Sequence, residues 1–227
     1  MAAPGSWSGL ASVVGAGFGA ASNKSLDPAS KDYNWVDDGK VFESVRKDNY
    51  NAIDANILPL GRDRLALTFG SFWSGIKLVY LDAKTGKPEK GAVVLSLARR
   101  PPPDALEAPF LIRRGRYFYL FVSFDLCCRG VRSTYNIRMG RSEKVEGPYV
   151  DKDGKAMMEE GGTLLLATEG NRIGPGHCAV LHDGGKDYLA YHYYDGARNG
   201  FPVLQITPMA WSREGWPILG AALAEAR

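Results

Sequence analysis

The feature that most constrains this chain is a strand pattern that occurs three times in succession. Each copy opens with a short apolar strand, NAIDANILPL, LEAPFLIRR or HCAVLHD, and continues through a turn into two further strands rich in Val, Ile, Tyr and Phe. Each opening strand carries one polar residue that core packing does not require, namely Asp54, Glu107 and His177. Such strands, separated by turn residues, predict an all-β protein with almost no helix.

Each unit closes with a tract rich in Gly, Pro and aromatic residues: KTGKPEKGAVVL, EGPYVDKDGKAMM and SREGWPI. These tracts predict a turn and an outer fourth strand. Four strands in roughly 50 to 70 residues are typical of a β-propeller blade. We therefore expect a single partial propeller domain, in which the end of a preceding blade and three full blades occupy residues 1–48, 49–103, 104–160 and 161–227. A closed ring takes ~4 to 8 blades, so this one is incomplete and its open edge needs a partner segment.

Composition argues against several classes of partner. Lys and Arg total 28 against 25 Asp and Glu, and no basic run concentrates the excess, which disfavours nucleic acid and anionic membranes. No apolar run reaches the ~20 residues of a membrane-spanning helix. The apolar stretch at residues 9–22 follows no Lys or Arg, so we interpret it as the end of a β unit and expect no signal peptide in this chain.

Three cysteines, Cys127, Cys128 and Cys178, have neither metal-finger spacing nor the density of a disulfide-stapled domain. This pattern predicts small buried hydrophobic residues.

The positions of two carboxylates suggest chemistry. Opening strands run innermost in a propeller, so Asp54 and Glu107 are expected to meet at the mouth of the central channel. Either residue alone could cap a turn or lie in a solvated loop, but their equivalent places in successive repeats favour a functional role. Two carboxyl groups that share a site raise the pKa of one of them, and a protonated carboxylic acid can protonate a departing sugar oxygen.

Aromatic and histidine side chains lie at the same strand ends. Trp73, followed by a Ser74-Gly75 turn, is the aromatic residue that we expect to be exposed and to stack on a sugar, whereas most others pack between blades. His177 lies in GPGHCAV, where it could be a metal ligand, a core histidine or a catalytic base.

Several longer strings are familiar. DYNWVDDGKVFES, NYNAIDAN, LTFGSFWSGIKLVYLDAKTGKP, EAPFLIRRGRYFYLFVSFDLCCRGVRSTYNIRMGRS, GPGHCAV and YHYYDGARNGFPVLQI closely resemble endo-1,5-α-L-arabinanases of glycoside hydrolase family 43. The resemblance covers nearly the whole chain. It implies a five-bladed propeller that is secreted and hydrolyses arabinan with inversion.

The resemblance also implies individual roles. Glu107 in EAPF corresponds to the general acid, and Asp54 in NAID to the aspartate that raises the pKa of that acid and orients substrate. His177 in GPGH corresponds to a histidine that reaches a largely hydrated calcium ion. The residues implied to contact arabinan or arabino-oligosaccharides are Asn51, Ser71, Phe72, Trp73 and Ser74.

One departure from the family pattern bears on activity. The family's general base is an aspartate in a His-Asp-Pro motif, and no such motif precedes Asp54. Asp27 is followed by Pro28, but SLDPAS falls in an outer connection. Inversion needs a second carboxylate ~6.5–9.5 Å from the acid. We therefore expect an arabinan hydrolase that lacks its general base and that would need a missing N-terminal segment as a partner. The alternatives are a non-catalytic arabinan-binding fragment and a fragment that does not fold. Ala55 also replaces a proline that is common in the family, which loosens that turn.

Overall fold

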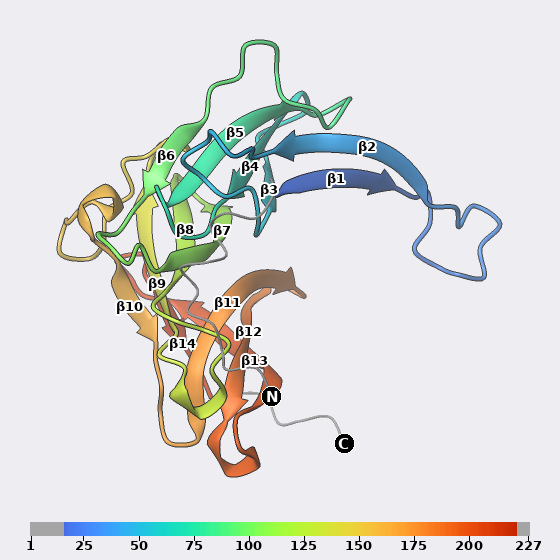
Figure 1. Cartoon of the computed structure of the whole chain (residues 1–227). Helices are drawn as coiled ribbons and strands as arrows, with labels where there is room; N and C mark the ends of the chain where they lie inside the picture. The colour runs from blue at the N-terminus through green and yellow to red at the C-terminus, as the bar shows by residue number, and fades with distance from the viewer. Residues whose placement is uncertain (1–15, 222–227) are drawn as a thin grey trace, which may run out of the picture.

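The computed structural model describes residues 16–221, and there the protein is built from antiparallel β-sheets (Figure 1). A two-stranded ribbon precedes three four-stranded sheets, and each sheet runs through its strands in chain order. Within the described residues the helical segments are short 3₁₀ turns, and none is long or apolar enough to cross a membrane. The all-β prediction is confirmed.

The ribbon and the first sheet come from the first part of the chain. The ribbon projects away from the body of the molecule (Figure 1) and consists of β1 (Gly17–Ser22) and β2 (Val36–Glu43). The first sheet contains β3 (Asn56–Pro59), β4 (Arg64–Phe69), β5 (Ile76–Asp82) and β6 (Leu95–Ala98).

The second and third sheets repeat the same plan. The second contains β7 (Leu106–Arg114), β8 (Tyr117–Phe124), β9 (Asn136–Ser142) and β10 (Thr163–Leu166). The third contains β11 (Arg172–Asp183), β12 (Lys186–Asp195), β13 (Phe201–Trp211) and β14 (Pro217–Leu219). The 3₁₀ turns are η2 (Gly130–Arg132), η3 (Met157–Glu159) and η4 (Gly196–Arg198).

One predicted boundary is wrong. We placed the end of the second unit at residue 160, but β10 pairs with β9 and completes the second sheet, so that unit extends to Leu166. The tract EGPYVDKDGKAMM forms turns, two isolated bridges at Val150 and the start of η3, and the outer strand follows it. Glycine and proline end a strand reliably, but they do not fix how long the following loop is.

Strand β8 packs against both neighbouring sheets. Its sequence, YFYLFVSF, is almost entirely apolar, and alternate side chains of a strand point to opposite faces. Leu120 is buried in a core that includes Leu78 of the first sheet, whereas Tyr119 and Phe121 are buried in a core that includes Leu189 of the third. A strand covered on both faces is therefore a continuous apolar run.

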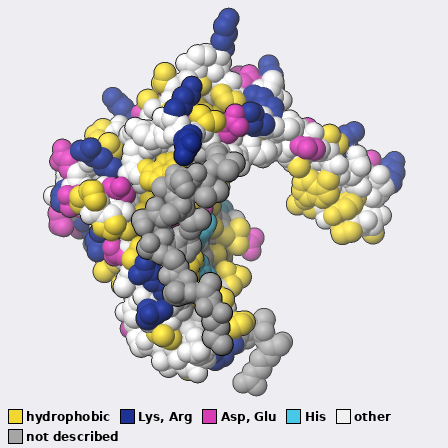
Figure 2. All heavy atoms as spheres, viewed as in Figure 1, with side chains coloured by type: hydrophobic (Ala, Val, Ile, Leu, Met, Phe, Trp, Pro, Cys, Tyr) yellow, Lys and Arg dark blue, Asp and Glu magenta, His cyan; other side chains and the backbone are white. Residues whose placement is uncertain are grey.

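A third core attaches the ribbon to the first sheet. The rings of Phe18 and Phe42 lie 5.8 Å and 5.1 Å from the ring of Phe69, on β4. At the far end of the ribbon, the β1–β2 connection and the first residue of β2 expose an apolar group (Figure 2) that consists of Leu26, Tyr33, Trp35 and Val36.

The cysteines depart from expectation. Cys127 and Cys128 are bonded to each other in a vicinal disulfide, with Cys127 half-buried and Cys128 exposed, so the prediction of small buried residues is wrong for this pair. It is confirmed for Cys178, which is a free, buried thiol. Adjacent cysteines in a tight loop can bond locally, which spacing rules for longer-range disulfides do not detect.

Candidate active site

Three polar residues lie on, or just before, the opening strands of the three sheets. Asp54 lies two residues before β3, Glu107 is the second residue of β7, and His177 lies within β11. The backbone is in the left-handed region at Asp54 (φ 60°), at Ala108 (φ 53°) and at His177 (φ 49°). Non-glycine residues in this region cost about 1–3 kcal/mol each and cluster at functional sites. Register shifts after Glu107 and on either side of Gly176 mark bulges, which re-aim side chains at these points.

Asp54 and Glu107 are brought together from neighbouring sheets. The backbone N–H of Ala108, the residue after Glu107, donates a 3.0 Å hydrogen bond to Oδ2 of Asp54. The pKa of Asp54 is raised, chiefly because burial penalises its anion; the nearby charge of His177 lowers it, and that of Glu107 raises it. The three residues that the repeat pattern selected therefore share one site, in which Asp54 is a carboxyl group with a raised pKa.

Two hydroxyl groups hold the Glu107 carboxylate. Ser71 Oγ donates to Oε2 at 2.8 Å, and Tyr135 Oη donates to Oε1 at 2.7 Å. Both hydroxyl-bearing residues are buried. Burial, followed by the charge of Glu107, raises the pKa of Tyr135, so its phenol stays protonated and remains a donor. Because each of its two oxygens accepts a hydrogen bond, the Glu107 carboxyl group is fixed in one orientation.

Residues of β8, β11 and β12 pack around Tyr135 and His177; Ser123 and Gly176 are buried, and His192 is half-buried. A Cβ atom on Gly176 would lie 1.9 Å from Cδ1 of Tyr135, so only glycine leaves room for that ring. The N–H of His177 donates to Ser123 Oγ at 2.8 Å. The ring of His192 lies 5.9 Å from that of Tyr135, and burial, followed by the charge of His177, lowers the pKa of His192.

Sequence reasoning missed Tyr135, Ser123 and His192. Tyr135 follows a loop, in STYNIR, and nothing in that string distinguishes it from a core tyrosine. His192 interrupts the apolar run DYLAYHYY, and this polar residue within a strand was the available signal.

The turn between β4 and β5 connects Glu107 to a surface depression. Phe72 N–H donates to the carbonyl oxygen of Leu106 at 2.8 Å, which ties the turn to the strand that carries Glu107. The turn's Trp73 is 38% exposed, as predicted. An open depression of about 450 Å³ is lined by Arg46, Asp48, Asn49, Trp73 and Ser74.

The other residues expected to contact substrate lie outside this lining. Ser71 is engaged with Glu107, Phe72 is half-buried, and Asn51 is half-buried with its carbonyl oxygen accepting from Ile53 N–H.

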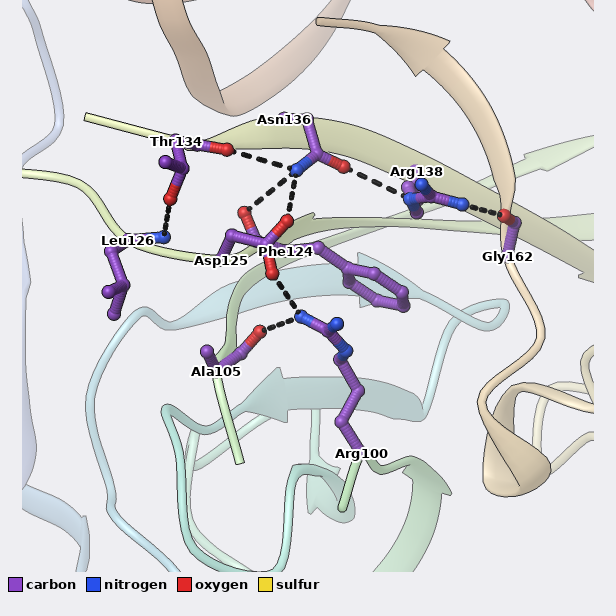
Figure 3. A network of polar contacts seen from close by, with 9 residues as sticks. All are labelled: Arg100, Ala105, Phe124, Asp125, Leu126, Thr134, Asn136, Arg138 and Gly162. Atoms are coloured by element: carbon purple, nitrogen blue, oxygen red, sulfur yellow. Dashed lines mark hydrogen bonds and ion pairs between the residues drawn. The ribbon is translucent and has the colours of Figure 1, made fainter. Parts of the chain in front are cut away.

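A polar network fixes the ends of β7 and β9 that carry the site (Figure 3). Arg100 Nη1 donates to Oδ1 of Asp125 and to the carbonyl oxygen of Ala105, both at 2.8 Å. Asn136 Nδ2 donates to Oδ2 of Asp125 at 2.7 Å. Ala105 lies two residues before Glu107 and Asn136 follows Tyr135, so the network holds the backbone on both sides of their hydrogen bond.

The donor set offers little to calcium, which prefers about six to eight oxygen ligands. Within residues 16–221, no three His, Cys, Asp or Glu side chains are arranged to hold a metal ion. The carboxylates of Asp54 and Glu107 already accept hydrogen bonds, and His177 offers a single imidazole. These residues do not complete a calcium shell by themselves.

Comparison with known proteins gives a consistent family. Residues 14–217 match the model for glycosyl hydrolases family 43. The extracellular exo-α-(1→5)-L-arabinofuranosidase ArbA of Cellvibrio japonicus is 41% identical over 211 residues, which cover 88% of this chain and 61% of the relative. The extracellular endo-α-(1→5)-L-arabinanase 1 of Bacillus subtilis is 46% identical over 183 residues, which cover 81% and 55% respectively.

The fold agrees with these matches. The structure of Cellvibrio cellulosa α-L-arabinanase complexed with arabinohexaose superposes with a TM-score of 0.85 at 40% identity, covering 90% of this chain and 68% of that one. The chain spans less than two thirds of the length of the Cellvibrio japonicus and Bacillus subtilis relatives. On the strength of the matched residues and the shared fold, the chain belongs to glycosyl hydrolases family 43.

Proposed function

We propose that this chain is the acid-bearing part of a hydrolase that cleaves α-1,5-linked L-arabinan, with Glu107 as general acid. The observation that carries the proposal is the fixed Glu107 carboxyl group, held by Ser71 and Tyr135 and adjacent to Asp54. In this role Glu107 gives its proton to the glycosidic oxygen as the bond breaks. Asp54 acts on Glu107 through its charge and orients the substrate. The names of the relatives, which are arabinan-cleaving enzymes, support the substrate class.

We further propose that the three four-stranded sheets are blades of a five-bladed propeller. Their chain-order topology supports this arrangement, as does the proximity of Asp54, Glu107 and His177, which come from the opening segments of three different sheets. A further N-terminal segment would supply the remaining blades and the general base. Asp27 does not replace that base, because it is exposed in the β1–β2 connection and its Oδ1 accepts from Ala29 N–H, as in a turn. By analogy with its extracellular relatives, we assign the enzyme to the outside of the cell.

His177 is the proposed contact for a largely hydrated calcium ion. The His177 side chain is exposed, which leaves room for coordinated water beside it. No step of the reaction above depends on this ion.

The test is hydrolysis of linear arabinan by this chain, alone and with the N-terminal segment of a family member added. We expect activity in the supplemented sample and its loss in Glu107→Gln, which keeps the shape of the side chain but cannot give up a proton as an acid. Activity that survives Glu107→Gln would refute the assignment of the acid.

A non-catalytic arabinan-binding role is the second candidate. The depression lined by Trp73, Ser74 and Asn49 favours it, since an exposed indole beside polar groups suits a sugar ring. Arabino-oligosaccharide affinity that survives Glu107→Gln and is lost in Trp73→Ala, without hydrolysis in the supplemented sample, would select this role.

A further inference from the structure

The vicinal disulfide lies at the rim of the carboxylate site. Cys127 and Cys128 belong to the connection between β8 and β9. This connection leaves β8 just after Ser123, the residue that pairs with Glu107 across the sheet, and ends at Tyr135. The disulfide therefore lies in the loop that joins two elements of the site, with Cys128 exposed to solvent.

The same loop is packed closely against the connection between β12 and β13. A Cβ atom on Gly200 would lie 2.6 Å from the backbone nitrogen of Val131, so the two backbones touch at this point. Within the loop, Arg129 N–H donates to Ser133 Oγ at 3.0 Å. The loop is thus held both by contacts within it and by contact with a neighbouring segment.

A series of direct contacts leads from the disulfide to Glu107. Cys128 N–H donates to Tyr194 Oη at 2.7 Å. The ring of Tyr194 lies 5.3 Å from that of His192, and the ring of His192 lies 5.9 Å from that of Tyr135, which donates to Glu107. Cys128 also has a left-handed backbone, with φ of 63°, which a non-glycine residue keeps only when its surroundings enforce it.

We propose that the Cys127–Cys128 disulfide is a thiol-exchange site for small dithiols, and that its opening loosens the ring contacts which support Tyr135 beneath Glu107. Exposed disulfides are the more readily exchanged ones, and Cys128 is the exposed residue of this pair. This inference does not depend on the proposed hydrolase function.

The exchange is a two-electron reduction. A thiolate of the dithiol attacks Sγ of Cys128, the S–S bond breaks, and Cys127 leaves as a thiolate that takes up a proton. The second thiol of the reagent then attacks the mixed disulfide and releases Cys128 as a thiolate, which is also protonated. The reagent ends as a cyclic disulfide and the protein as two thiols. Once the covalent ring is open, Cys128 can leave the left-handed region, and its N–H moves away from Tyr194.

Alkylation with iodoacetamide followed by peptide mass analysis tests the first half of the proposal. In native buffer we expect no alkylated cysteine before treatment, because Cys178 is buried and the other two are bonded. After dithiothreitol we expect Cys127 and Cys128 to be alkylated and Cys178 to remain unlabelled. Labelling of the pair without reductant would overturn the proposal.

Histidine ring resonances in NMR spectra test the coupling. Reduction should shift the resonances of His192 and leave those of His182 unchanged. His182 is hydrogen-bonded to Asp187 at the other end of β11 and β12. In Tyr194→Phe the pair should still be alkylated, but the His192 shift on reduction should be lost. The double variant Cys127→Ser/Cys128→Ser should not respond to dithiothreitol.

Two outcomes contradict this coupling. The first is a His192 resonance that stays unmoved when the pair is fully alkylated. The second is an equal movement of His182 and His192 with loss of spectral dispersion, since that would mean that reduction unfolds the chain.

Discussion

Tyr135, the residue before β9, donates a 2.7 Å hydrogen bond to Oε1 of Glu107, which lies 28 residues earlier in the chain on β7. The phenol is buried, and its ring occupies the space that the absence of a side chain at Gly176 leaves. The proposed acid thus depends on a tyrosine for its orientation and, through it, on a glycine of the next sheet.

Tyr135→Phe should keep the ring and remove the donor. A hydrogen bond to a charged group contributes about 1.5–3 kcal/mol, so we expect a loss of that order in the free energy of unfolding measured in urea at pH 7. Tyr149→Phe is the matched control, because it removes a buried hydrogen bond to the carbonyl oxygen of Val145, outside the site. Hydrolysis in the supplemented assay should fall in Tyr135→Phe and not in the control; equal rates would contradict the orienting role.

Gly176→Ala should displace Tyr135, because the new Cβ would lie 1.9 Å from its ring. Overpacking of this kind costs about 1–3 kcal/mol, which chemical denaturation would detect as a lower midpoint at an unchanged slope. Gly19→Ala is the control: the nearest atom to its Cβ, the carbonyl oxygen of Gly39, would lie 3.8 Å away. A tolerated alanine at position 176 would show that the tyrosine ring is not held there.

Asp54→Asn should stabilise the fold at neutral pH. The pKa of Asp54 is raised above its ordinary value of 3.8, mainly by burial, so folding favours the protonated form. The contribution of protonated Asp54 to the free energy of unfolding is present in full below the pKa that Asp54 has in the unfolded chain. This contribution is lost as the pH rises through the pKa that Asp54 has in the folded protein. Asparagine keeps an acceptor for Ala108 N–H and has no charge to bury. Urea unfolding at several pH values should show a gain at pH 7 that disappears near pH 3; a gain independent of pH would contradict the electrostatic cause.

Glu107→Gln should lower the pKa of Asp54, because the charge of Glu107 is one of the causes that raise it. Titration of the side-chain carboxyl carbon of Asp54 by NMR measures this directly. An unchanged or higher value would mean that the two carboxyl groups do not interact.

Trp73→Ala should weaken binding of arabino-oligosaccharide with little effect on stability. An aromatic contact of about 1.4 kcal/mol corresponds to roughly a tenfold loss in affinity. Trp35→Ala is the control, since Trp35 is 54% exposed in the β1–β2 connection and does not line the depression. Calorimetric titration of both variants would show whether the loss is specific to position 73.

The sequence by itself determined the all-β class, the three four-stranded units and the polar residues that stand out on their opening strands. Period-two apolar strands and turn residues are local signals, and they sufficed to predict an all-β chain with three four-stranded units. The polar residues Asp54, Glu107 and His177 stood out because each interrupts an apolar strand at an equivalent place in its repeat.

Only the tertiary structure decided how those residues are held. No local pattern encodes the contacts between sheets on which the site depends. These contacts produce the hydrogen bond from Tyr135 to Glu107, the space for the Tyr135 ring beside Gly176 and the raised pKa of Asp54. The same holds for β10, whose pairing with β9 follows a long loop. Strand periodicity is set by the backbone, whereas burial, charge and hydrogen bonding at the site are set by residues that are distant in the chain.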